Sequence, residues 1–478
     1  MNKLLETFFF ANAVVLYTQV IVFTLILFVV ALLLFILRRK NHQLEFDSIT
    51  GLPNYSHFRK RVRKVLASAV PNQYMILSFN IDNLGLINET YGISTGNELL
   101  KRVGKHFNRH CSKNEFVLRF FADNFIYFTR NPGFFWNVEE RVYEMTNFKD
   151  SLKDILPEHY NFTFTTSVYY IEDPRESLDS MIDKVNLAQK LRKNNFATHR
   201  VIEYTNEMKD SHEWNREITL TMENAYQNKE FEVFYQPKFD FTNEKVVGAE
   251  ALIRWNNPRK GFLQPGKFVP LFEDNGFIEK IDKFVFNKVC DFLDKWNHSA
   301  ESKTICPLTI SFNLSRYHLY NPNLIRELKA IAAKYDIGEN KIEVELTESI
   351  MFDNQQRLIK VMKEIKKAGF SVSVDDFGSG YSSSLNLLKN MPADVIKLDK
   401  EFLSVNPENQ KENIIISSVI DMAKKLKIKT VAEGVETKLQ CEMLKRIGCD
   451  IAQGFYYAKP MHEDSFRTLL SQSAKPIC

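Results

Sequence analysis

Residues 341–375 read KIEVELTESIMFDNQQRLIKVMKEIKKAGFSVSVD. Two short runs in this stretch, residues 341–345 and 371–375, are rich in Val and Ile, and each ends on a carboxylate. Between them, residues 350–368 carry apolar side chains at the spacing of an amphipathic helix. A strand, a helix and a second strand in this order predict two parallel strands that are joined by a crossover helix.

The same alternation of strands and helices extends over about 250 residues, which is the usual length of a (β/α)8 barrel. Eight strands are predicted, at Glu230–Gln236, Val246–Leu252, Pro307–Asn313, Lys341–Glu345, Ser371–Asp375, Asp394–Leu398, Lys429–Glu433 and Cys449–Gln453. Helical patterns are clearest at Pro265–Trp296, Asn323–Tyr335, Ile350–Ala368, Asn409–Leu426 and Leu439–Ile447. The gap between the first two strands is too short for a crossover helix, so this pair is predicted to be antiparallel. The C-terminal part of the chain is therefore predicted to be an α/β fold, a (β/α)8 barrel with one antiparallel strand pair.

A polar residue lies at or next to the end of each predicted strand. These residues are Gln236, Glu250, Asn313, Glu345, Asp375, Lys397, Glu433 and Gln453. Barrel enzymes build their active sites at this end from several strands at once, so the eight side chains are expected to converge. Two carboxylates about 4 Å apart repel by about 4 kcal/mol at an effective dielectric constant of about 20, so cations are expected among them.

The ligand chemistry indicates which cations these would be. Oxygen ligands, with no cysteine or paired histidine nearby, favour Mg²⁺ or Mn²⁺ over zinc. Adjacent Asp375 and Asp376 could hold two ions a few ångströms apart, an arrangement that suits in-line hydrolysis of a phosphodiester. Taken alone, a Glu at a strand end is more often a solvated rim residue, and an isolated Lys397 is more often a salt-bridge partner. The prediction therefore depends on the whole set.

Short motifs at these strand ends resemble the EAL family of cyclic di-GMP phosphodiesterases over residues 217–475. The motifs are YQP at 235–237, GAEALIRW at 248–255, FNLS at 312–315, ELTES at 345–349, DDFGSG at 375–380, IKLD at 396–399, AEGVE at 432–436 and QGF at 453–455 with Pro460. The resemblance implies hydrolysis of cyclic di-GMP to the linear dinucleotide pGpG with two divalent cations, Mg²⁺ or Mn²⁺. It also implies a homodimer, because barrels of this family are typically more active as dimers.

The resemblance implies roles for individual residues as well. The metal ligands would be Glu250, Asn313, Glu345, Asp375 and Asp376. Lys397 would hold the attacking water or stabilise developing negative charge, and Glu433 would lie close to the second ion. Substrate contacts would come from Gln236, Arg254 and Gln453, and Glu348 would brace the loop after the fifth strand.

One departure from the family lies in the loop that supports dimerisation and activity. The family usually has Tyr-Ser-Ser-Leu after the Asp-Phe-Gly motif, whereas Tyr381 is followed here by Ser382, Ser383 and Ser384. The proposed ligands are intact, but regulation can differ. The alternative to an enzyme is a catalytically silent receptor that binds cyclic di-GMP and signals through protein contacts.

The preceding segment, from Asp47 to about residue 206, alternates strand and helix patterns and is predicted to be an α+β domain. Strands are expected at Tyr74–Ile81 and Val168–Ile171, with a hairpin turn at residues 122–124 and helices at Asn97–Phe107 and Leu178–Arg192. The strings DSITGLPN at 47–54, NIDN at 80–83, INETYG at 87–92 and GNELL at 96–100 resemble the diguanylate cyclase (GGDEF) family. The hairpin that names this family would be FADNF at 121–125.

The residues that cyclase chemistry requires are mostly replaced. The two glycines of the family's hairpin are replaced by Phe121 and Ala122, and its metal-binding aspartate is replaced by Asn80. Gly85 stands in place of a phosphate-contacting lysine, and Asn97 in place of a further aspartate. The R-x-x-D inhibition site is absent, because its two positions carry Ser112 and Glu115. Asp123 remains, although a lone aspartate in a hairpin is more often a turn residue. We expect no cyclase activity and a scaffolding or regulatory role; GTP binding without turnover stays open.

The N-terminal segment is predicted to be a transmembrane helix. Every residue from Val20 to Leu37 is apolar except Thr24, and about 20 apolar residues span a bilayer. A secretory signal peptide is the rival, but the apolar run continues directly into Arg38, Arg39 and Lys40. By the positive-inside rule, the chain is expected to contact membrane lipid through a single pass in the inner membrane, with its catalytic domains in the cytoplasm.

The predicted organisation is an anchor at residues 1–40, a degenerate GGDEF-like domain at 41–206, a connector at 207–216 and an EAL barrel at 217–478. The formal net charge of +4 is small for 478 residues and argues against a nucleic-acid polymer as partner. The six cysteines form no C-x-x-C pair, which favours reduced thiols over a disulfide framework.

Overall fold

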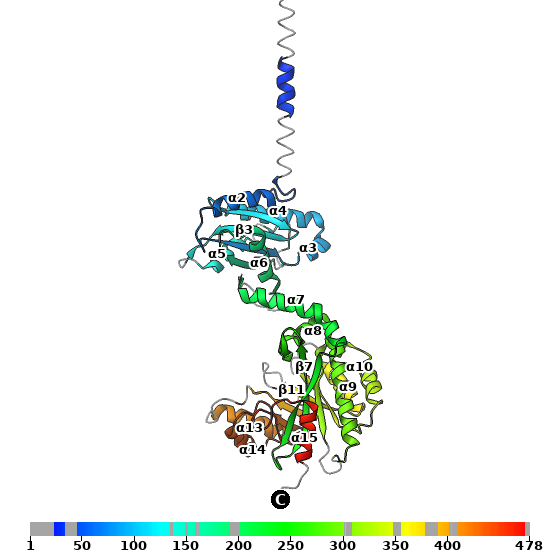
Figure 1. Cartoon of the computed structure of the whole chain (residues 1–478). Coiled ribbons are helices and arrows are strands. Elements are labelled where there is room, and N and C mark those ends of the chain that lie inside the picture. Colours follow the sequence, from blue (N-terminus) through cyan, green and yellow to red (C-terminus); the bar gives the residue numbers. More distant parts are fainter. Residues whose placement is uncertain are drawn as a thin grey trace, which may run out of the picture. The chain divides into compact units, whose positions relative to one another are not determined.

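The computed structural model of the chain divides into two compact units, Met1–Trp214 and Asn215–Cys478 (Figure 1). It describes residues 23–33, 45–133, 137–148, 152–157, 160, 162–191, 201–300, 302, 308–347, 355–377, 391–400, 403 and 410–473.

The first unit is built on a five-stranded sheet in the order β2-β3-β1-β4-β5. The strands are β1 (Tyr74–Ile81), β2 (Phe116–Phe121), β3 (Asn124–Arg130), β4 (Phe164–Tyr170) and β5 (Ile202–Glu203). The helices are α2 (Tyr55–Leu66), α3 (Leu84–Tyr91), α4 (Ile93–Arg109), α5 (Val138–Thr146) and α6 (Leu178–Leu191). Alternate residues of the central strand β1 enter different cores, because successive strand side chains point to opposite faces. Leu77 packs in a cluster with residues of α4, and Ile76 packs in a cluster with residues of α2 and α6, so helices cover both faces.

The second unit is a closed barrel. Its strands are β6 (Phe231–Asp240), β7 (Val246–Asn257), β9 (Thr309–Asn313), β10 (Ile342–Thr347), β11 (Ser371–Phe377), β12 (Val395–Leu398), β13 (Lys429–Ala432) and β14 (Ile451–Ala452). They pair in the order β6-β14-β13-β12-β11-β10-β9-β7, and a β6–β7 pairing closes the ring. Strand β6 is antiparallel to both neighbours, and the other pairings around the ring are parallel. The predicted α/β barrel with an antiparallel first pair is confirmed.

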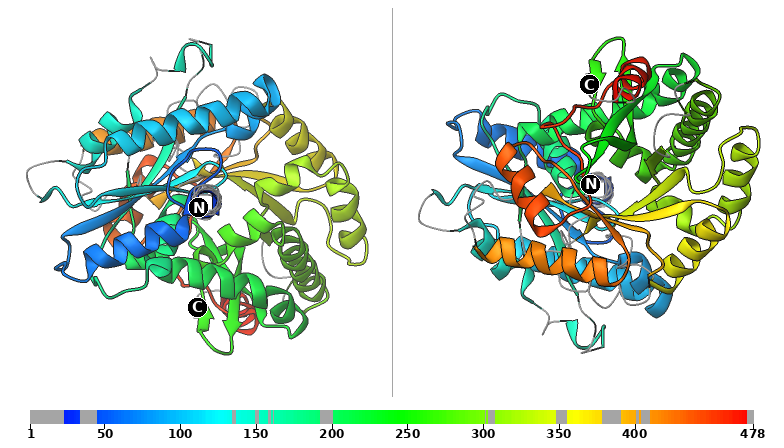
Figure 2. Two further views of the ribbon diagram at one scale, coloured as in Figure 1. Left: turned by 90° about the horizontal axis from the view of Figure 1, so that it is seen from above. Right: turned by 90° about the horizontal axis from the view of Figure 1, so that it is seen from below.

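Helices surround this barrel. They are α8 (Val269–Asn275), α9 (Ile278–Asn297), α10 (Leu324–Ala332), α11 (Gln355–Lys367), α13 (Gln410–Lys425), α14 (Lys438–Ile447) and α15 (Glu463–Ser473). Helix α9 packs on β9 and α11 on β11, with the helices outside the strands (Figure 2). The strands they cover are therefore buried on both faces, and even the small polar side chains of Ser311 in β9 and Ser373 in β11 are buried.

Several details of the second unit differ from the sequence-based expectation. Strands β6 and β7 end at Asp240 and Asn257, beyond the predicted Gln236 and Leu252, so Gln236 and Glu250 lie within their strands and not at the ends. The helical pattern at Pro265–Trp296 is not one helix, but a 3-10 turn at Pro265–Lys267 followed by α8 and α9. Gly276 ends α8 with a φ of +80°, a left-handed conformation that glycine adopts without strain. A short strand, β8 (Gly261–Leu263), was not predicted and extends the sheet beyond β7.

The segment that links the two units is helical. Helix α7 runs from Asn206 to Gln227 and contains the whole of the predicted connector, residues 207–216. The division between the units falls within this helix, between Trp214 and Asn215.

Near the N-terminus, residues 23–33 are helical and their side chains are exposed. The rest of the predicted span Val20–Leu37 lies outside the described residues. Within the described parts of the chain, no helix is both long enough and apolar enough to cross a bilayer.

Candidate active site

The register of the barrel pairs four of the predicted site residues directly. Gln236 pairs with Glu250 between β6 and β7, and Asn313 pairs with Glu345 between β9 and β10. Successive side chains of a strand alternate between the interior and the exterior, so residues at matched positions face the interior together. Their positions define the mouth of the barrel, at the carboxyl ends of the parallel strands.

Lys397 lies at the centre of this mouth and is almost completely buried. Its Nζ lies 2.7 Å from Glu345 Oε2, 3.0 Å from Asp375 Oδ1, 2.5 Å from Glu433 Oε1 and 3.4 Å from Glu250 Oε2. One ammonium group therefore contacts four carboxylates, which come from β7, β10, β11 and the residue that follows β13. These carboxylates raise the pKa of Lys397 against the opposing effect of burial, so it stays charged.

Three amide side chains complete the mouth around Glu250. Asn313 Nδ2 donates to Glu250 Oε1 at 2.7 Å, and Gln453 Nε2 donates to Glu250 Oε2 at 2.6 Å. Gln453 also donates to Gln236 Oε1 at 3.1 Å. Glu250 therefore has a hydrogen-bonded amide at each oxygen, which fixes the orientation of its carboxylate.

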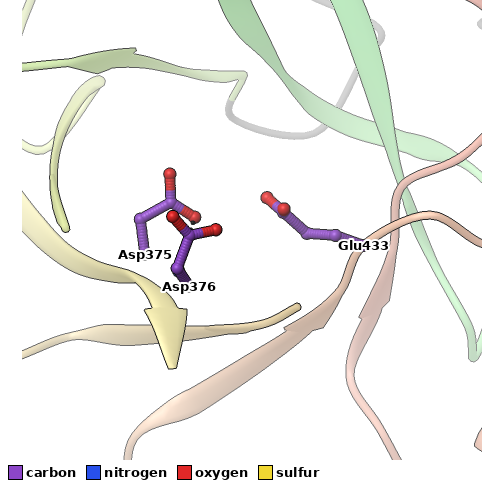
Figure 3. A group of neighbouring side chains, drawn as sticks. All are labelled: Asp375, Asp376 and Glu433. Carbon is purple, nitrogen blue, oxygen red and sulfur yellow. Dashed lines mark hydrogen bonds between the residues drawn. The ribbon is translucent and has the colours of Figure 1, made fainter. Parts of the chain in front are cut away.

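Asp375, Asp376 and Glu433 form a tighter group whose ligand oxygens all lie within 4.8 Å of one another. Figure 3 shows the three carboxylates pointing toward a common space, with the two aspartates at the end of β11 and Glu433 approaching from another part of the barrel. Asp376 has a φ of +54°, an uncommon conformation for a residue other than glycine. This backbone turn directs two successive carboxylates to the same place, where an extended strand would direct them to opposite faces.

The ionisation of these carboxyls reflects burial and crowding. Burial raises the pKa of Glu433 to about 8 even though Lys397 opposes the shift. Burial, and then the charge of Asp375, raise the pKa of Asp376 to about 7. Glu345 is also buried, but two lysine ammonium groups outweigh burial and lower its pKa to about 2. Asp376 and Glu433 would thus be fully ionised at neutral pH only if another cation were present.

The donor set fits hard divalent cations. Carboxylate and amide oxygens are the ligands that Mg²⁺ and Mn²⁺ prefer, and the group formed by Asp375, Asp376 and Glu433 is compact enough to share an ion. The carboxylates at the mouth outnumber the lysines that contact them, so added positive charge would relieve their repulsion.

The other predicted site residues are less central or lie outside the described parts. Arg254 follows Glu250 by four residues on β7 and therefore shares its face. Its guanidinium donates to the carbonyl of Ile253 at 2.8 Å and lies 5.8 Å from the ring centre of Phe234. Glu348 and the serines at 382–384 lie outside the described residues.

A cavity of about 460 Å³ opens beside Asn313 and Thr347. Its walls are mainly apolar residues of β7, α8 and α9, with the polar side chains of Glu273, Asp282 and Ser315. Ser315 donates to Glu273 at 2.6 Å and its backbone N–H donates to Asp282 at 3.0 Å, so this polar wall is fixed by hydrogen bonds. The volume lies within the usual range for small-molecule sites.

Lys238 is a site residue that the strand-end pattern missed. It is buried and contacts Glu345 Oε1 at 3.0 Å. Strand periodicity could have identified it, because it follows Gln236 by two residues on β6 and therefore points to the same interior.

In the first unit, Asn80 lies at the position where the resemblance implies a metal-binding aspartate, and it contacts Asp123. Asn80 Nδ2 donates to Asp123 Oδ2 at 3.3 Å, so the remaining aspartate already has an amide partner. The carboxylate of Asp82 accepts hydrogen bonds from the hydroxyl groups of Thr163 and Thr165, each with an O–O distance of 2.7 Å. Phe121 is 58% exposed beside Ala122, so a large ring lies at a position where the resemblance implies glycine.

Comparison with protein families assigns both units. The model described as "EAL domain" matches residues 220–460, just over half of the chain, and the model described as "Diguanylate cyclase, GGDEF domain" matches residues 44–197. The chain is 29% identical over 432 residues to the signaling protein YkoW of Bacillus subtilis, covering 89% of this chain and 53% of YkoW. It is 26% identical over 451 residues to the cyclic di-GMP phosphodiesterase NbdA of Pseudomonas aeruginosa, covering 90% of this chain and 55% of NbdA.

Among solved structures, the EAL enzyme Bd1971 in its cAMP- and cyclic-di-GMP-bound form has a TM-score of 0.52 and 27% identity. The match covers 62% of this chain and 77% of Bd1971. The chain spans about half the length of the first curated relatives it matches. With its closed barrel and the family match over half of its length, the chain belongs to the EAL domain family, and a GGDEF domain precedes its EAL domain.

Proposed function

We propose that this chain hydrolyses cyclic di-GMP to the linear dinucleotide pGpG in a reaction that depends on two divalent cations, Mg²⁺ or Mn²⁺. The observation that carries the proposal is the convergence of Glu250, Glu345, Asp375 and Glu433 on Lys397 at the barrel mouth. Such a concentration of buried charge is costly for stability and is typical of a functional site. Similarity to a cyclic di-GMP phosphodiesterase and to an EAL enzyme with bound cyclic di-GMP supports the choice of substrate.

The proposed ligands are Glu250, Asn313, Glu345, Asp375 and Asp376. Two bound cations would polarise the phosphodiester and provide a nucleophilic water at neutral pH. Lys397 Nζ would orient this water or stabilise negative charge on the phosphate oxygens. Glu433, whose Oε1 lies 2.5 Å from Lys397 Nζ, would lie close to the second ion.

Substrate binding is proposed to use residues around the same mouth. Gln236 and Gln453 would contact the substrate or ordered water, and the planar guanidinium of Arg254 would pair with a phosphate. The cavity beside Asn313 has room for part of a dinucleotide.

The test is a hydrolysis assay of the purified full chain with cyclic di-GMP and Mn²⁺ or Mg²⁺, in which pGpG is separated by chromatography. We expect pGpG to form and its formation to stop when a chelator is added. Ca²⁺ should inhibit, because a larger ion with looser geometry would disturb the in-line arrangement. Tight binding of cyclic di-GMP without turnover would instead identify a silent receptor.

The GGDEF domain is proposed to be degenerate and to act as a scaffold. Asn80 cannot supply the negative charge that a hard divalent ion prefers, and side chains fill the space of the two glycines. Incubation of the full chain with GTP and each cation should yield no cyclic di-GMP. Formation of the cyclic dinucleotide would contradict the proposal, and binding of GTP without turnover would show that a nucleotide pocket remains.

The chain is further proposed to be a single-pass protein of the inner membrane that forms a homodimer with its catalytic domains in the cytoplasm. The apolar segment Val20–Leu37 and the basic residues that follow it support this topology. After cell fractionation, the protein should stay in the membrane pellet through a high-salt or alkaline wash. Sedimentation in detergent should give twice the monomer mass, and a wholly soluble monomer would contradict both parts.

A further inference from the structure

Lys238 is a buried lysine that enters the carboxylate cluster from inside the barrel. Strand β6 runs antiparallel to its neighbours, so each later residue of β6 lies further from the mouth. Gln236 pairs with Glu250 at the mouth, and Lys238 pairs with Gly248 one step deeper. Its side chain therefore reaches the proposed metal ligands from the side opposite to solvent.

The ammonium group of Lys238 is held by three acceptors. Its Nζ lies 2.7 Å from Ser311 Oγ, 3.1 Å from Glu343 Oε1 and 3.0 Å from Glu345 Oε1. A lysine ammonium has three N–H donors, so these contacts can occupy all of them. Because the group is buried, any shift would leave a donor without a partner in a region of low polarity.

Lys238 and Lys397 divide the two oxygens of Glu345 between them. Oε1 accepts from Lys238, and Oε2 accepts from Lys397 at 2.7 Å. Lys397 also contacts Glu250 and Asp375, so Oε2 is the oxygen that faces the other proposed ligands. Oε1 faces Lys238 and is already hydrogen-bonded to a cation.

We propose that Lys238 is a positioning residue that restricts Glu345 to metal ligation through Oε2 alone and thereby favours Mn²⁺ and Mg²⁺ over Ca²⁺. This inference rests on the proposed metal-dependent function. Mg²⁺ requires near-ideal octahedral geometry at short distances, whereas Ca²⁺ takes six to eight oxygens and accepts bidentate carboxylates. A carboxylate whose Oε1 is held by Lys238, on the side away from the other proposed ligands, suits the smaller ions and withholds a ligand atom from Ca²⁺.

A purely electrostatic role makes a different prediction. The three ions carry the same charge, so removing one nearby positive charge would shift their affinities in the same direction and by similar amounts. An anchoring role changes the ratio between the affinities, because only Ca²⁺ gains from a second oxygen. The ratio therefore distinguishes the two roles.

The experiment measures Mn²⁺ binding to the purified full chain from the electron paramagnetic resonance signal of free Mn²⁺, with Ca²⁺ and Mg²⁺ as competitors. Lys238→Met removes the anchor. Lys238→Met combined with Glu343→Gln also removes a carboxylate that would otherwise stay buried without its cation, which protects folding. Glu343→Gln alone is the matched control, because it alters a partner of Lys238 and leaves the contact with Glu345.

In both variants without Lys238, we expect the affinity for Ca²⁺ relative to Mn²⁺ to rise about tenfold, which corresponds to about 1.4 kcal/mol. Glu343→Gln should leave the ratio unchanged, and the ratio of Mg²⁺ to Mn²⁺ should change little in any variant. Equal changes in the affinities for all three ions would overturn the role of Lys238 while leaving the proposed function in place. An unchanged ratio of Ca²⁺ to Mn²⁺ affinity, in variants that still bind Mn²⁺, would do the same. Failure of the unaltered chain to bind Mn²⁺ would overturn both.

Discussion

The single ammonium group of Lys397 contacts four carboxylates at the barrel mouth. Replacing it by Met should lower the rate of cyclic di-GMP hydrolysis by about two orders of magnitude or more, the scale for losing one charge-stabilising donor. Substrate binding should be largely kept, so kcat should fall more than KM changes. Steady-state kinetics with saturating Mn²⁺ measure this, and Lys429→Met, an exposed lysine at the start of β13, is the control. Near-normal turnover in Lys397→Met would remove it from the catalytic machinery.

Ala122 carries backbone strain in the hairpin of the GGDEF domain, where its φ is +44°. A left-handed conformation costs a residue with a Cβ about 1–2 kcal/mol, and glycine avoids this cost. Ala122→Gly should therefore stabilise the first unit by about 0.5–1 kcal/mol after the added chain entropy of glycine is subtracted. Ala67, at the end of α2 with a φ of −58°, is the control, since glycine there should be destabilising. Thermal unfolding of the full chain measures the stability change of each glycine variant. Stability changes of the same sign in the two variants would contradict the backbone strain at Ala122.

Glu115 should make the first unit sensitive to acid. Burial raises its pKa, but hydrogen bonds from Thr129, Ser112 and Arg130 and the charge of Arg141 outweigh burial and hold the pKa below its usual 4.5. Such a group contributes stability above pH 4.5, and this contribution is lost as the pH falls through the lower folded-state pKa.

Glu115→Gln removes this titration. We expect the variant to be less stable at pH 7, by about 1–3 kcal/mol, because the hydrogen bonds lose their charge. Its stability should also change less than that of the unaltered protein as the pH falls below 4.5. Unfolding by urea at a series of pH values tests both expectations, and parallel curves would show that Glu115 has no part in the acid response.

At the scale of elements, helix α14 has a capping box that orders the segment after Glu433. Thr437 accepts from the backbone of Gln440, and Gln440 Oε1 accepts the backbone N–H groups of Thr437 and Glu436 at 3.0 and 2.9 Å. Thr437→Ala should destabilise the second unit by about 1 kcal/mol, the usual value of an N-cap. Thr437→Ser keeps the hydroxyl and should cost much less. Thermal unfolding compares the two, and equal losses would show that the cap is not the cause.

At the scale of the whole molecule, the two units should respond differently to metal. The proposed ligands lie in the EAL barrel, whereas the GGDEF domain has Asn80 at the position where the resemblance implies a metal-binding aspartate. Calorimetry of the full chain should therefore show that Mn²⁺ raises the unfolding temperature of one transition and leaves the other unchanged. At 100 times its dissociation constant, a ligand adds about 2.7 kcal/mol of stability. A chelator should reverse the shift, and equal shifts of both transitions would place metal in both units.

The order of strands and helices, the antiparallel first pair and the strand-end polar residues could all be predicted from the sequence. This was possible because strand and helix periodicities are local properties of the chain, and parallel strands of a barrel end at the same side. The break at Gly276 and the helical connector α7 were harder to predict, since propensity and polarity specify element boundaries weakly.

Only the tertiary structure decided how the site residues meet. The sequence places Lys397 at one strand end among eight, but the closed ring is what surrounds its ammonium with four carboxylates. Lys238 was missed because the predicted first strand ended at Gln236, whereas β6 continues to Asp240 and carries Lys238 below the mouth toward Glu345. Likewise, the φ of +54° at Asp376 directs two successive aspartates to one place, against strand alternation. Such contacts join residues far apart in the chain, and local patterns carry no information about the distances between them.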